Sequence, residues 1–348
     1  MEELSGFLWS WEYGFDIIAL EMPERQGGKG MKIFAYALRE YDERELFIAA
    51  CEEAGVEYGY TSEYPSMENA DLAEGNEGIS IITNPVKPEL AQRFYDLGVR
   101  HISTRTIGMD HIDTEYCKKI GLKVSNITYT PGTVADYTVM MILMALRKMP
   151  LLMKKAELQD FSLEGKIGRE LRTCTVGIIG TGRIGKNVIR DLSGFGCRIL
   201  CYDVNPEPEA VHPASYVSFD TLIRESDIIS LHAPGIPETF HMIGAEEIRR
   251  MKRGVILVNC ARGLLIDSDA MIDALISGQI GYAALDTIEH EENLYYRNLC
   301  GVPLDRPQRA KLLSLPNVLL MSHMAFYTEQ AVGDMVRNSI SSLLEGHR

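Results

Sequence analysis

The stretch CTVGIIGTGRIGKNVIRDLSGFGCRILCYD, residues 174–203, decides the fold predicted for this chain. It begins with a short apolar run at 175–179 that is rich in β-branched residues, which indicates a buried strand. Three glycines in G-x-G-x-x-G spacing then open a helical segment: Gly180, Gly182 and Gly185. A second apolar run ends on Asp203, 18 residues after the last glycine. The stretch therefore predicts a strand–helix–strand unit with a glycine-rich turn.

This turn has the features of a dinucleotide-binding site. The glycines permit a tight turn, let a pyrophosphate approach bare backbone, and bring the helix close to the strand. The first N–H groups of the helix can bind the phosphates, and Asp203 lies where a carboxylate binds both ribose hydroxyls of an adenosine. The residues after Asp203, VNPEPEA, contain no Lys or Arg for a 2′-phosphate and two acids that would repel one. The sequence thus predicts NAD as the cofactor; a structural turn that binds nothing is the alternative.

Composition narrows the class of protein. The 348 residues, 46% hydrophobic and 24% charged, are enough for two globular domains. A net charge of −14 speaks against nucleic acid as a partner. The seven cysteines lack C-x-x-C spacing, so we expect neither disulfides nor a metal site. No segment has the length of a membrane span and no secretory signal is visible, so the expected location is the cytoplasm, without membrane contact.

Residues 1–30 fit poorly with the rest of the chain, since they contain both tryptophans and show no clear period. Met31 then starts MKIFAYALRE, which is typical of the first strand of a domain. We interpret 1–30 as a non-native or disordered extension, with translation beginning at Met31. A genuine extension that contacts a membrane surface or a partner is the alternative.

From Met31 onward, strand and helix patterns alternate. Strands are predicted at 32–37, 56–58, 79–83 and 99–103 with helices at 43–53 and 89–97, which favours a smaller parallel α/β domain without its own glycine motif. After residue 203, strand-like runs recur at 227–231, 255–259, 281–285 and 318–321, giving the six strands of a doubly wound sheet.

A long helix is predicted at 328–345, after the last strand, and we expect it to return to the first domain. The substrate domain would then be discontinuous, comprising 31–130 and 328–348, with the NAD-binding domain at 131–327 and a hinge near 130 and 327. A further helix should begin at Pro131–Gly132 and be stopped by Pro150. Its part from 139 to 146 is apolar on all sides, which indicates a core helix or, as we favour, a subunit interface of a homodimer.

Open α/β sheets bind ligands beyond the carboxyl ends of their strands. Three side chains follow predicted strands there: Arg262, Glu291 and His323. An Arg can hold a carboxylate bidentately, a His can donate a proton near neutral pH, and a carboxylate can orient that His. Together they predict a hydride-transfer site for an acid substrate.

Passages along nearly all of residues 31–348 resemble the D-isomer-specific 2-hydroxyacid dehydrogenase family, and within it the D-lactate dehydrogenases. The passages are RTIGMDHID (105–113), NITYTPGTVADY (126–137), VGIIGTGRIG (176–185), LHAPGIPETFHMI (231–243), VNCARGLLID (258–267), AALDTIEHEE (283–292) and PNVLLMSHMAFYT (316–328). The resemblance implies a Rossmann-type doubly wound parallel sheet for the cofactor domain and a smaller flavodoxin-like α/β substrate domain.

The resemblance also implies roles for individual residues. Arg262 would bind the substrate carboxylate and polarise the carbonyl, while His323, paired with Glu291, would donate the proton. Three residues of the other domain would also hold the carboxylate: Ile107, Gly108 and Tyr129. Tyr129 and Phe326 would narrow the pocket. Cofactor contacts are implied for Gly180, Thr181, Gly182, Arg183, Ile184, Gly185, Asp203, His232, Ala233, Pro234, Asn259, Ala261, Asp286 and Ala325.

The chain departs from the family at Ser322, where a proline commonly precedes the catalytic His, and at Met324, where a Thr is usual. These departures bear on the size of the preferred substrate. The expected activity is reduction of pyruvate to D-lactate with NADH. The alternatives are bulkier 2-keto acids, such as 2-ketoisocaproate or phenylpyruvate, and a non-catalytic NAD-sensing protein similar to a corepressor.

Overall fold

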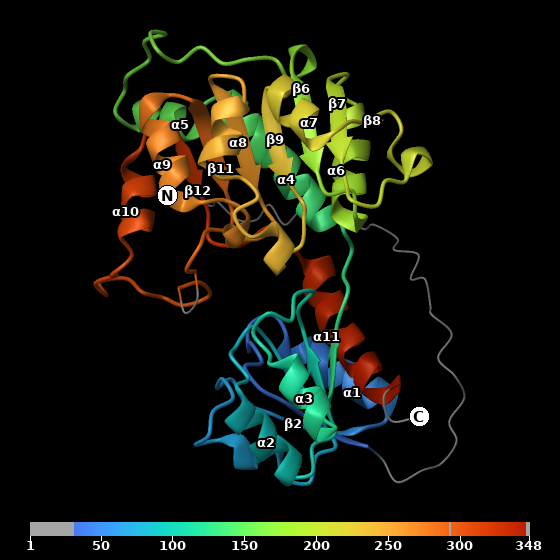
Figure 1. Ribbon diagram of the computed structural model, residues 1–348. Helices are drawn as coiled ribbons and strands as arrows, with labels where there is room; N and C mark the ends of the chain where they lie inside the picture. Colours follow the sequence, from blue (N-terminus) through green and yellow to red (C-terminus); the bar gives the residue numbers. More distant parts are fainter. Residues whose placement is uncertain (1–30, 292–293, 346–348) are drawn as a thin grey trace, which may run out of the picture.

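The computed structural model describes residues 31–291 and 294–345, which form two parallel sheets with helices on both faces (Figure 1). The expected α/β fold class is thereby confirmed. The segment 1–30, interpreted from its sequence as an extension, lies outside the described residues. The division of the chain near 130 and 327 into a substrate domain and an NAD-binding domain stays a prediction.

The first sheet has the strand order β2-β1-β3-β4-β5, which is the order of flavodoxin-like sheets. Its strands are β1 (Lys32–Ala35), β2 (Glu57–Tyr60), β3 (Gly78–Ile81), β4 (His101–Thr104) and β5 (Lys123–Asn126). We did not predict β5, because its four residues are all half-buried or exposed and form no apolar run.

Four helices cover this sheet. They are α1 (Arg44–Ala54) and α11 (Glu329–Glu345) on one face, and α2 (Pro88–Asp96) and α3 (Thr114–Ile120) on the other. Although α11 follows the last strand of the second sheet, it lies beside α1 (Figure 1). Its Ser339 hydroxyl contacts the hydroxyls of Ser80 at 2.7 Å and Ser103 at 3.0 Å, all three buried. A Cβ on Gly78 would lie 3.0 Å from Leu343, so α11 needs a glycine on β3.

The second sheet has the order β12-β11-β10-β9-β6-β7-β8 and is parallel throughout. Its strands are β6 (Thr175–Ile179), β7 (Arg198–Tyr202), β8 (Ser215–Tyr216), β9 (Ile228–Leu231), β10 (Val255–Asn259), β11 (Ile280–Leu285) and β12 (Val318–Leu320). The six predicted strands are present, in the Rossmann arrangement around β6. The extra strand, β8, has two residues and leaves no pattern in the sequence.

Helices pack on both faces of this sheet. They are α4 (Gly132–Leu146) and α6 (Arg183–Ser193) on one face, and α7 (Phe219–Glu225), α8 (Ala245–Arg250), α9 (Ser268–Ser277) and α10 (Pro307–Ser314) on the other. Short 3₁₀ turns connect some of the elements: η1 (Ala70–Ala73), η2 (Leu171–Thr173), η3 (Pro208–Val211), η4 (Pro237–Thr239) and η5 (Gly263–Leu265). Because both faces are covered, β10 reads as an apolar run and all five of its residues are buried.

The helix predicted to stop at Pro150 is two helices. Helix α4 ends at Leu146, and Lys148 adopts a left-handed conformation with φ of 51°. A second helix, α5 (Met149–Glu157), then begins with Pro150 in its first turn, where a proline costs no hydrogen bond. The predicted helix therefore does end before Pro150, but at Leu146, and Pro150 itself lies in the first turn of the next helix.

The apolar surface of α4 is divided. Met141 and Ile142 are buried in the core of the second sheet, whereas Met140 is 39% exposed. Most of the apolar character of this helix is thus explained by packing within the chain. Among the described residues, no helix combines the length and the apolar character needed to cross a membrane.

Buried His101 should make the protein less stable in acid. Burial lowers its pKa to about 4, so the folded chain keeps it neutral where an unfolded chain protonates it, near pH 6.5. The unfolded state therefore binds more protons between pH 6.5 and about 4, and stability falls as the pH drops through this window. From pH 7 to about pH 5.5, we expect the melting temperature of His101→Asn to fall about 2 °C less than that of the wild type, measured by circular dichroism. Equal falls would contradict this prediction.

Candidate active site

The glycine-rich turn has the shape that a dinucleotide requires. Gly180 has a φ of 93°, and a Cβ there would lie 2.6 Å from the backbone of His232. A Cβ on Gly185 would overlap the carbonyl oxygen of Gly180, which explains the close approach of α6 to β6. Around Gly182, by contrast, a Cβ would meet no atom within 4 Å. No side chain caps the start of α6, so its first N–H groups face this open space and fit a pyrophosphate.

Asp203 is held ready beside this turn. Its Oδ2 accepts hydrogen bonds from the backbone N–H of Thr181 at 2.6 Å and from the Thr181 hydroxyl at 3.0 Å. The same hydroxyl contacts the Tyr216 hydroxyl at 2.7 Å. Because β8 supplies Tyr216, the strand that sequence reasoning missed helps to place the carboxylate expected on the adenosine ribose.

The other expected cofactor residues lie at the ends of strands β9 to β12 or in the loops that follow them, at one edge of the sheet. They are His232, Ala233, Pro234, Asn259, Ala261, Asp286 and Ala325. The side chain of Asn259 shapes a turn there, accepting from the N–H of Ala261 at 3.0 Å and donating to the carbonyl of Arg262 at 2.9 Å. Burial lowers the pKa of His232 to about 4, so this imidazole is neutral. Arg183 and Ile184 begin α6, next to the open space at Gly182.

A buried carboxylate holds the loop that carries His323. Asp286 is fully buried, and its two oxygens accept the backbone N–H groups of Met324 and Ala325 at 2.9 Å each. Its own carbonyl accepts the N–H of His323 at 2.8 Å. His323 is thereby kept at a φ of 56°. Residues other than glycine rarely adopt this backbone conformation, and it often marks a functional site.

The expected proton donor and its partner are brought together. Nδ1 of His323 lies 2.7 Å from Oε1 of Glu291, and the other oxygen of Glu291 accepts the N–H of Ile288 at 3.2 Å. The Tyr296 hydroxyl donates to the carbonyl of His323 at 3.0 Å. With Nδ1 turned to the carboxylate, the other ring nitrogen, Nε2, points away from it and is available to a substrate.

Arg262 reaches the first sheet. Its Nε lies 3.3 Å from Oδ2 of Asp110, in the loop that follows β4, and its Nη1 donates to the carbonyl of Ala261 at 2.9 Å. A Cβ on Gly108 would overlap Nη2 of Arg262, so the guanidinium lies directly against the backbone of this loop. Sequence reasoning missed Asp110, although it lies in the quoted RTIGMDHID passage, because only the fold shows which cation it meets.

Side chains fix the backbone of this loop. The Asn126 amide donates to the carbonyl of Ile107 at 2.6 Å, and the Thr106 hydroxyl donates to the carbonyl of Gly108 at 2.6 Å. Both carbonyls are therefore occupied, and the loop presents Gly108 to Arg262. That the N–H groups of Ile107 and Gly108 bind a carboxylate stays a prediction.

Aromatic side chains enclose the space around His323. Phe326 packs edge-on against Tyr296, with ring centroids 5.8 Å apart. Tyr129 contacts the cores of both sheets; burial raises the pKa of its phenol to about 12, while Arg262 lowers it, so it is a neutral donor. Phe326 and Tyr129 were predicted, whereas Tyr296 was not, because it lies in a long connection without regular structure.

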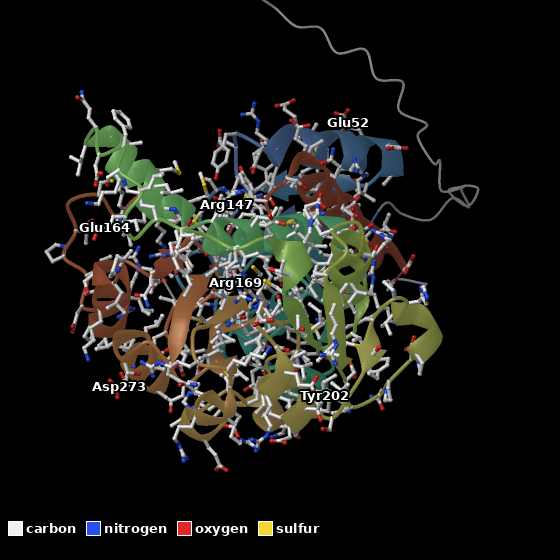
Figure 2. All side chains as sticks on the ribbon, turned by 90° about the horizontal axis from the view of Figure 1, so that it is seen from above. Glu52, Arg147, Glu164, Arg169, Tyr202 and Asp273 are labelled. Atoms are coloured by element: carbon white, nitrogen blue, oxygen red, sulfur yellow. The ribbon has the colours of Figure 1, made fainter. Side chains whose placement is uncertain are left out.

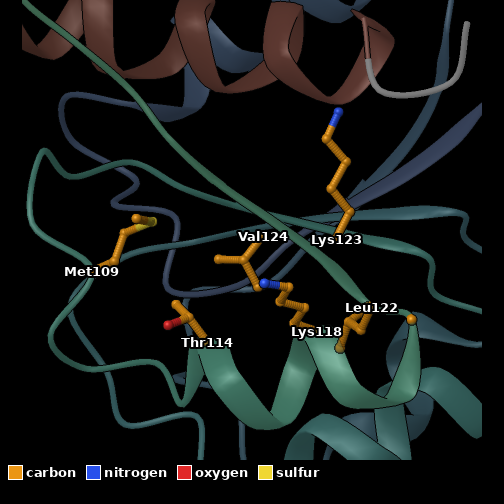
Figure 3. Close-up of a pocket in the computed structure, with 7 residues that line it drawn as sticks. Met109, Thr114, Lys118, Leu122, Lys123 and Val124 are labelled. Atoms are coloured by element: carbon orange, nitrogen blue, oxygen red, sulfur yellow. The ribbon is translucent and has the colours of Figure 1, made fainter.

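Two hollows accompany the site. One, of about 480 Å³, lies between the 39–41 segment and the 294–309 connection, and Tyr295, Tyr296 and Phe326 are among its lining residues. The other, of about 430 Å³, lies between α3 and β5, with Met109 at one side and Leu122 at the other (Figure 3). None of the expected site residues lines the second hollow. Within residues 31–291 and 294–345, no group of three or more His, Cys, Asp or Glu side chains could hold a metal.

Comparison with known proteins agrees with this geometry. The profile of the family described as D-isomer specific 2-hydroxyacid dehydrogenase, NAD binding domain, matches residues 139–325. An aromatic 2-oxoacid reductase of Clostridium sporogenes is 41% identical over 324 residues, covering 90% of this chain and 96% of the relative. A D-lactate dehydrogenase of Lactiplantibacillus plantarum is 40% identical over 316 residues, covering 90% and 95%.

Among solved structures, the NAD-complexed form of the D-isomer specific 2-hydroxyacid dehydrogenase of Lactobacillus delbrueckii ssp. bulgaricus superimposes with a TM-score of 0.80 at 33% identity. The match covers 91% of this chain and 97% of that one. The family profile and these relatives establish NAD as the cofactor. The chain therefore belongs to the D-isomer specific 2-hydroxyacid dehydrogenase family, as an NAD-dependent oxidoreductase that acts on CH–OH groups.

Proposed function

We propose that the protein is a D-lactate dehydrogenase that reduces pyruvate to D-lactate with NADH. The observation that carries the proposal is the 2.7 Å contact between Nδ1 of His323 and Oε1 of Glu291, with the rings of Tyr295 and Tyr296 close to the imidazole. NADH supplies the hydride that is added to C2 of the keto acid. The residues of the chain bind the acid, orient it and deliver the proton.

In this proposal Arg262 binds the substrate carboxylate, and its charge also polarises the C2 carbonyl. The N–H groups of Ile107 and Gly108 and the Tyr129 hydroxyl hold the carboxylate from the opposite side. As the hydride is added to C2, the carbonyl oxygen takes the proton from Nε2 of His323. Glu291 compensates the charge of the protonated imidazole and keeps the ring oriented through Nδ1.

A second candidate substrate class is the bulkier 2-keto acids, such as 2-ketoisocaproate and phenylpyruvate. The hollow of about 480 Å³ favours it, because Ser322 and Met324, the chain neighbours of His323, are among its lining residues together with aromatic rings. The relative from Clostridium sporogenes described as an aromatic 2-oxoacid reductase points the same way. Pyruvate remains our first choice, since we expect Tyr129 and Phe326 to narrow the substrate pocket.

We also place the protein in the cytoplasm. All seven cysteines are free thiols, and five of them are buried in the hydrophobic cores of the two sheets: Cys51, Cys117, Cys174, Cys201 and Cys260. Free thiols are typical of a reducing compartment.

A homodimer is the proposed assembly. No residue of α5 is buried, and the segment after it carries Leu158, Phe161, Leu163 and Ile167, each more than three-quarters exposed. Figure 2 shows Glu164, within this segment, at the margin of the molecule and far from Tyr202. A run of exposed apolar residues of this kind is typical of an interface, and a second copy of the chain would cover it.

The dimer can be tested by charge. Phe161→Asp combined with Leu163→Asp should place two carboxylates in the interface and halve the mass found by analytical ultracentrifugation. Ile276→Asp, at a 68% exposed position on α9, is the matched control and should keep the wild-type mass. A wild-type monomer, or a double variant of unchanged mass, would contradict the proposed interface.

The activity can be tested by following NADH absorbance with pyruvate, 2-ketoisocaproate and phenylpyruvate, and by determining the chirality of the product. We expect the highest kcat/KM with pyruvate and a D-hydroxy acid product. A higher value with phenylpyruvate would assign the second substrate class, and no turnover with any 2-keto acid would refute both.

In the same assay, His323→Gln should lower kcat by roughly 100- to 10,000-fold and leave NADH binding unchanged, because it removes the proton donor. The matched control is His241→Gln, since His241 also lies 2.7 Å from a glutamate, Glu289, and has a positive φ of 50°. The control should keep most of the wild-type kcat.

Gly108→Ala tests the contact between the two sheets. The added Cβ would overlap Nη2 of Arg262, so the guanidinium must move from its place beside the carboxylate-binding loop. Since a displacement of about 1 Å can cost about 100-fold, we expect kcat/KM for the 2-keto acid to fall between roughly 10- and 100-fold. Gly194→Ala, where the nearest atom lies 3.7 Å away, is the control, and an equal loss in both variants would contradict this interpretation.

A further inference from the structure

A series of ion pairs and hydrogen bonds between side chains connects the carboxylate-binding loop with the loop of His323. It starts at Arg105, the residue that opens the first loop, and ends at Tyr327, four residues after His323. Between them lie Glu43, Arg39 and Asp42, all close to the start of α1. None of these five residues has a role in the proposed chemistry.

The Arg105 end is built into the core. Arg105 is the largest fully buried side chain among the described residues, and its Nε lies 3.0 Å from Oε1 of Glu43, which is also fully buried. The remaining N–H groups of Arg105 donate to the Ser80 hydroxyl at 3.0 Å and to the carbonyls of Tyr36 at 3.1 Å and Ala37 at 2.9 Å. These contacts hold the Arg105 side chain in a single position. Removing one member of the Arg105–Glu43 pair would leave the other charge buried without compensation.

The next step passes through Arg39. Its backbone N–H donates to Oε2 of Glu43 at 3.0 Å, and its Nη2 lies 3.4 Å from Oε1 of the same carboxylate. Its Nε donates to both oxygens of Asp42, at 2.9 and 3.0 Å. Glu43 is thus shared between Arg105 and Arg39, and Asp42 is held by Arg39.

The last step joins the loops of the two sheets. The Tyr327 hydroxyl donates to Oδ2 of Asp42 at 2.6 Å, and the Arg39 guanidinium lies 5.7 Å from the centroid of the Tyr327 ring. On its other side, the N–H of Tyr327 donates to the carbonyl of Met324 at 2.9 Å, directly after His323. Tyr327 therefore contacts both the segment between β1 and α1 and the loop that carries His323.

We propose that Tyr327 and Asp42 form a latch that sets the separation between the carboxylate-binding loop and the His323 loop. The latch rests on Arg39, Glu43 and Arg105. Its residues are positioning residues, since they act through the two loops and have no part in the proposed binding of the carboxylate or in the proton transfer. The inference rests on the proposed function in one respect, namely that the 105–110 loop binds the carboxylate. With the latch closed, the carboxylate and the C2 carbonyl of one small acid reach their partners together.

The test uses Tyr327→Phe, which removes one hydroxyl and keeps the ring. We expect KM for the 2-keto acid to rise roughly ten-fold and kcat to change less than about two-fold. The reason is that the latch positions the bound acid equally in the ground state and in the transition state, so that its loss weakens binding in both. Kd for NADH and the melting temperature should stay at wild-type values. Tyr60→Phe is the matched control, since Tyr60 lies on β2, outside the latch and both hollows, and is 37% exposed, and it should leave all four quantities unchanged.

A double-mutant cycle adds specificity. Asp42→Ala removes the acceptor of the Tyr327 hydroxyl together with the two bonds from Arg39. The double variant with Tyr327→Phe should therefore raise KM by less than the product of the two single effects, because both substitutions break the same Tyr327–Asp42 hydrogen bond. Additive effects of the two substitutions would overturn the latch. An unchanged KM in Tyr327→Phe, or a fall in kcat together with a fall in melting temperature, would overturn it as well.

A second measurement does not depend on turnover. In the NADH complex, amide hydrogen exchange of a peptide covering 105–110 should be faster in Tyr327→Phe than in the wild type, and unchanged in Tyr60→Phe. Unchanged exchange in Tyr327→Phe refutes the latch even if the enzyme reduces pyruvate. Absence of turnover in the wild type, with faster exchange in the variant, refutes the proposed function and leaves the latch in place.

Discussion

A single buried carboxylate, that of Asp286, governs the geometry of the reaction centre. Its side chain accepts the N–H groups of Met324 and Ala325, and its carbonyl accepts that of His323. Burial raises its pKa, so the carboxylate depends on these donors to stay charged. These hydrogen bonds also hold His323 in a left-handed conformation that the backbone would otherwise avoid. The orientation of His323 toward Glu291 follows from these contacts between the end of β11 and the loop after β12.

The site is divided between the two sheets according to chemistry. In the proposed mechanism the second sheet supplies the nicotinamide side, the proton donor His323 and Arg262, whereas the first supplies the backbone N–H groups of the 105–110 loop, Tyr129 and Asp110. Arg262 joins the two parts, since it is anchored on the turn after β10 and lies against the loop after β4. In this arrangement Asp110 compensates part of the guanidinium charge, so an incoming carboxylate shares the cation with a group of the protein.

Much of this could be predicted from residues 174–203 and from the strand ends, because buried parallel strands are read as apolar runs and their carboxyl ends share one edge. Arg262, Glu291 and His323 were found in this way. What could not be predicted depends on contacts between segments far apart in sequence, such as Asp110 with Arg262 and Tyr327 with Asp42. The strands β5 and β8 were missed because they are short and partly exposed, and α5 was missed because its proline was read only as a helix stop.

The position of α11 has a consequence for the order of folding during synthesis. This helix packs with α1 in the core that contains Ile33, Phe47 and Val56, and Ser339 satisfies two buried hydroxyls there. The ribosome makes it only after every strand of both sheets. The second sheet can therefore acquire all of its covering helices while one face of the first sheet is covered by α1 alone. The part of the protein that is translated first is thus the part that is completed last.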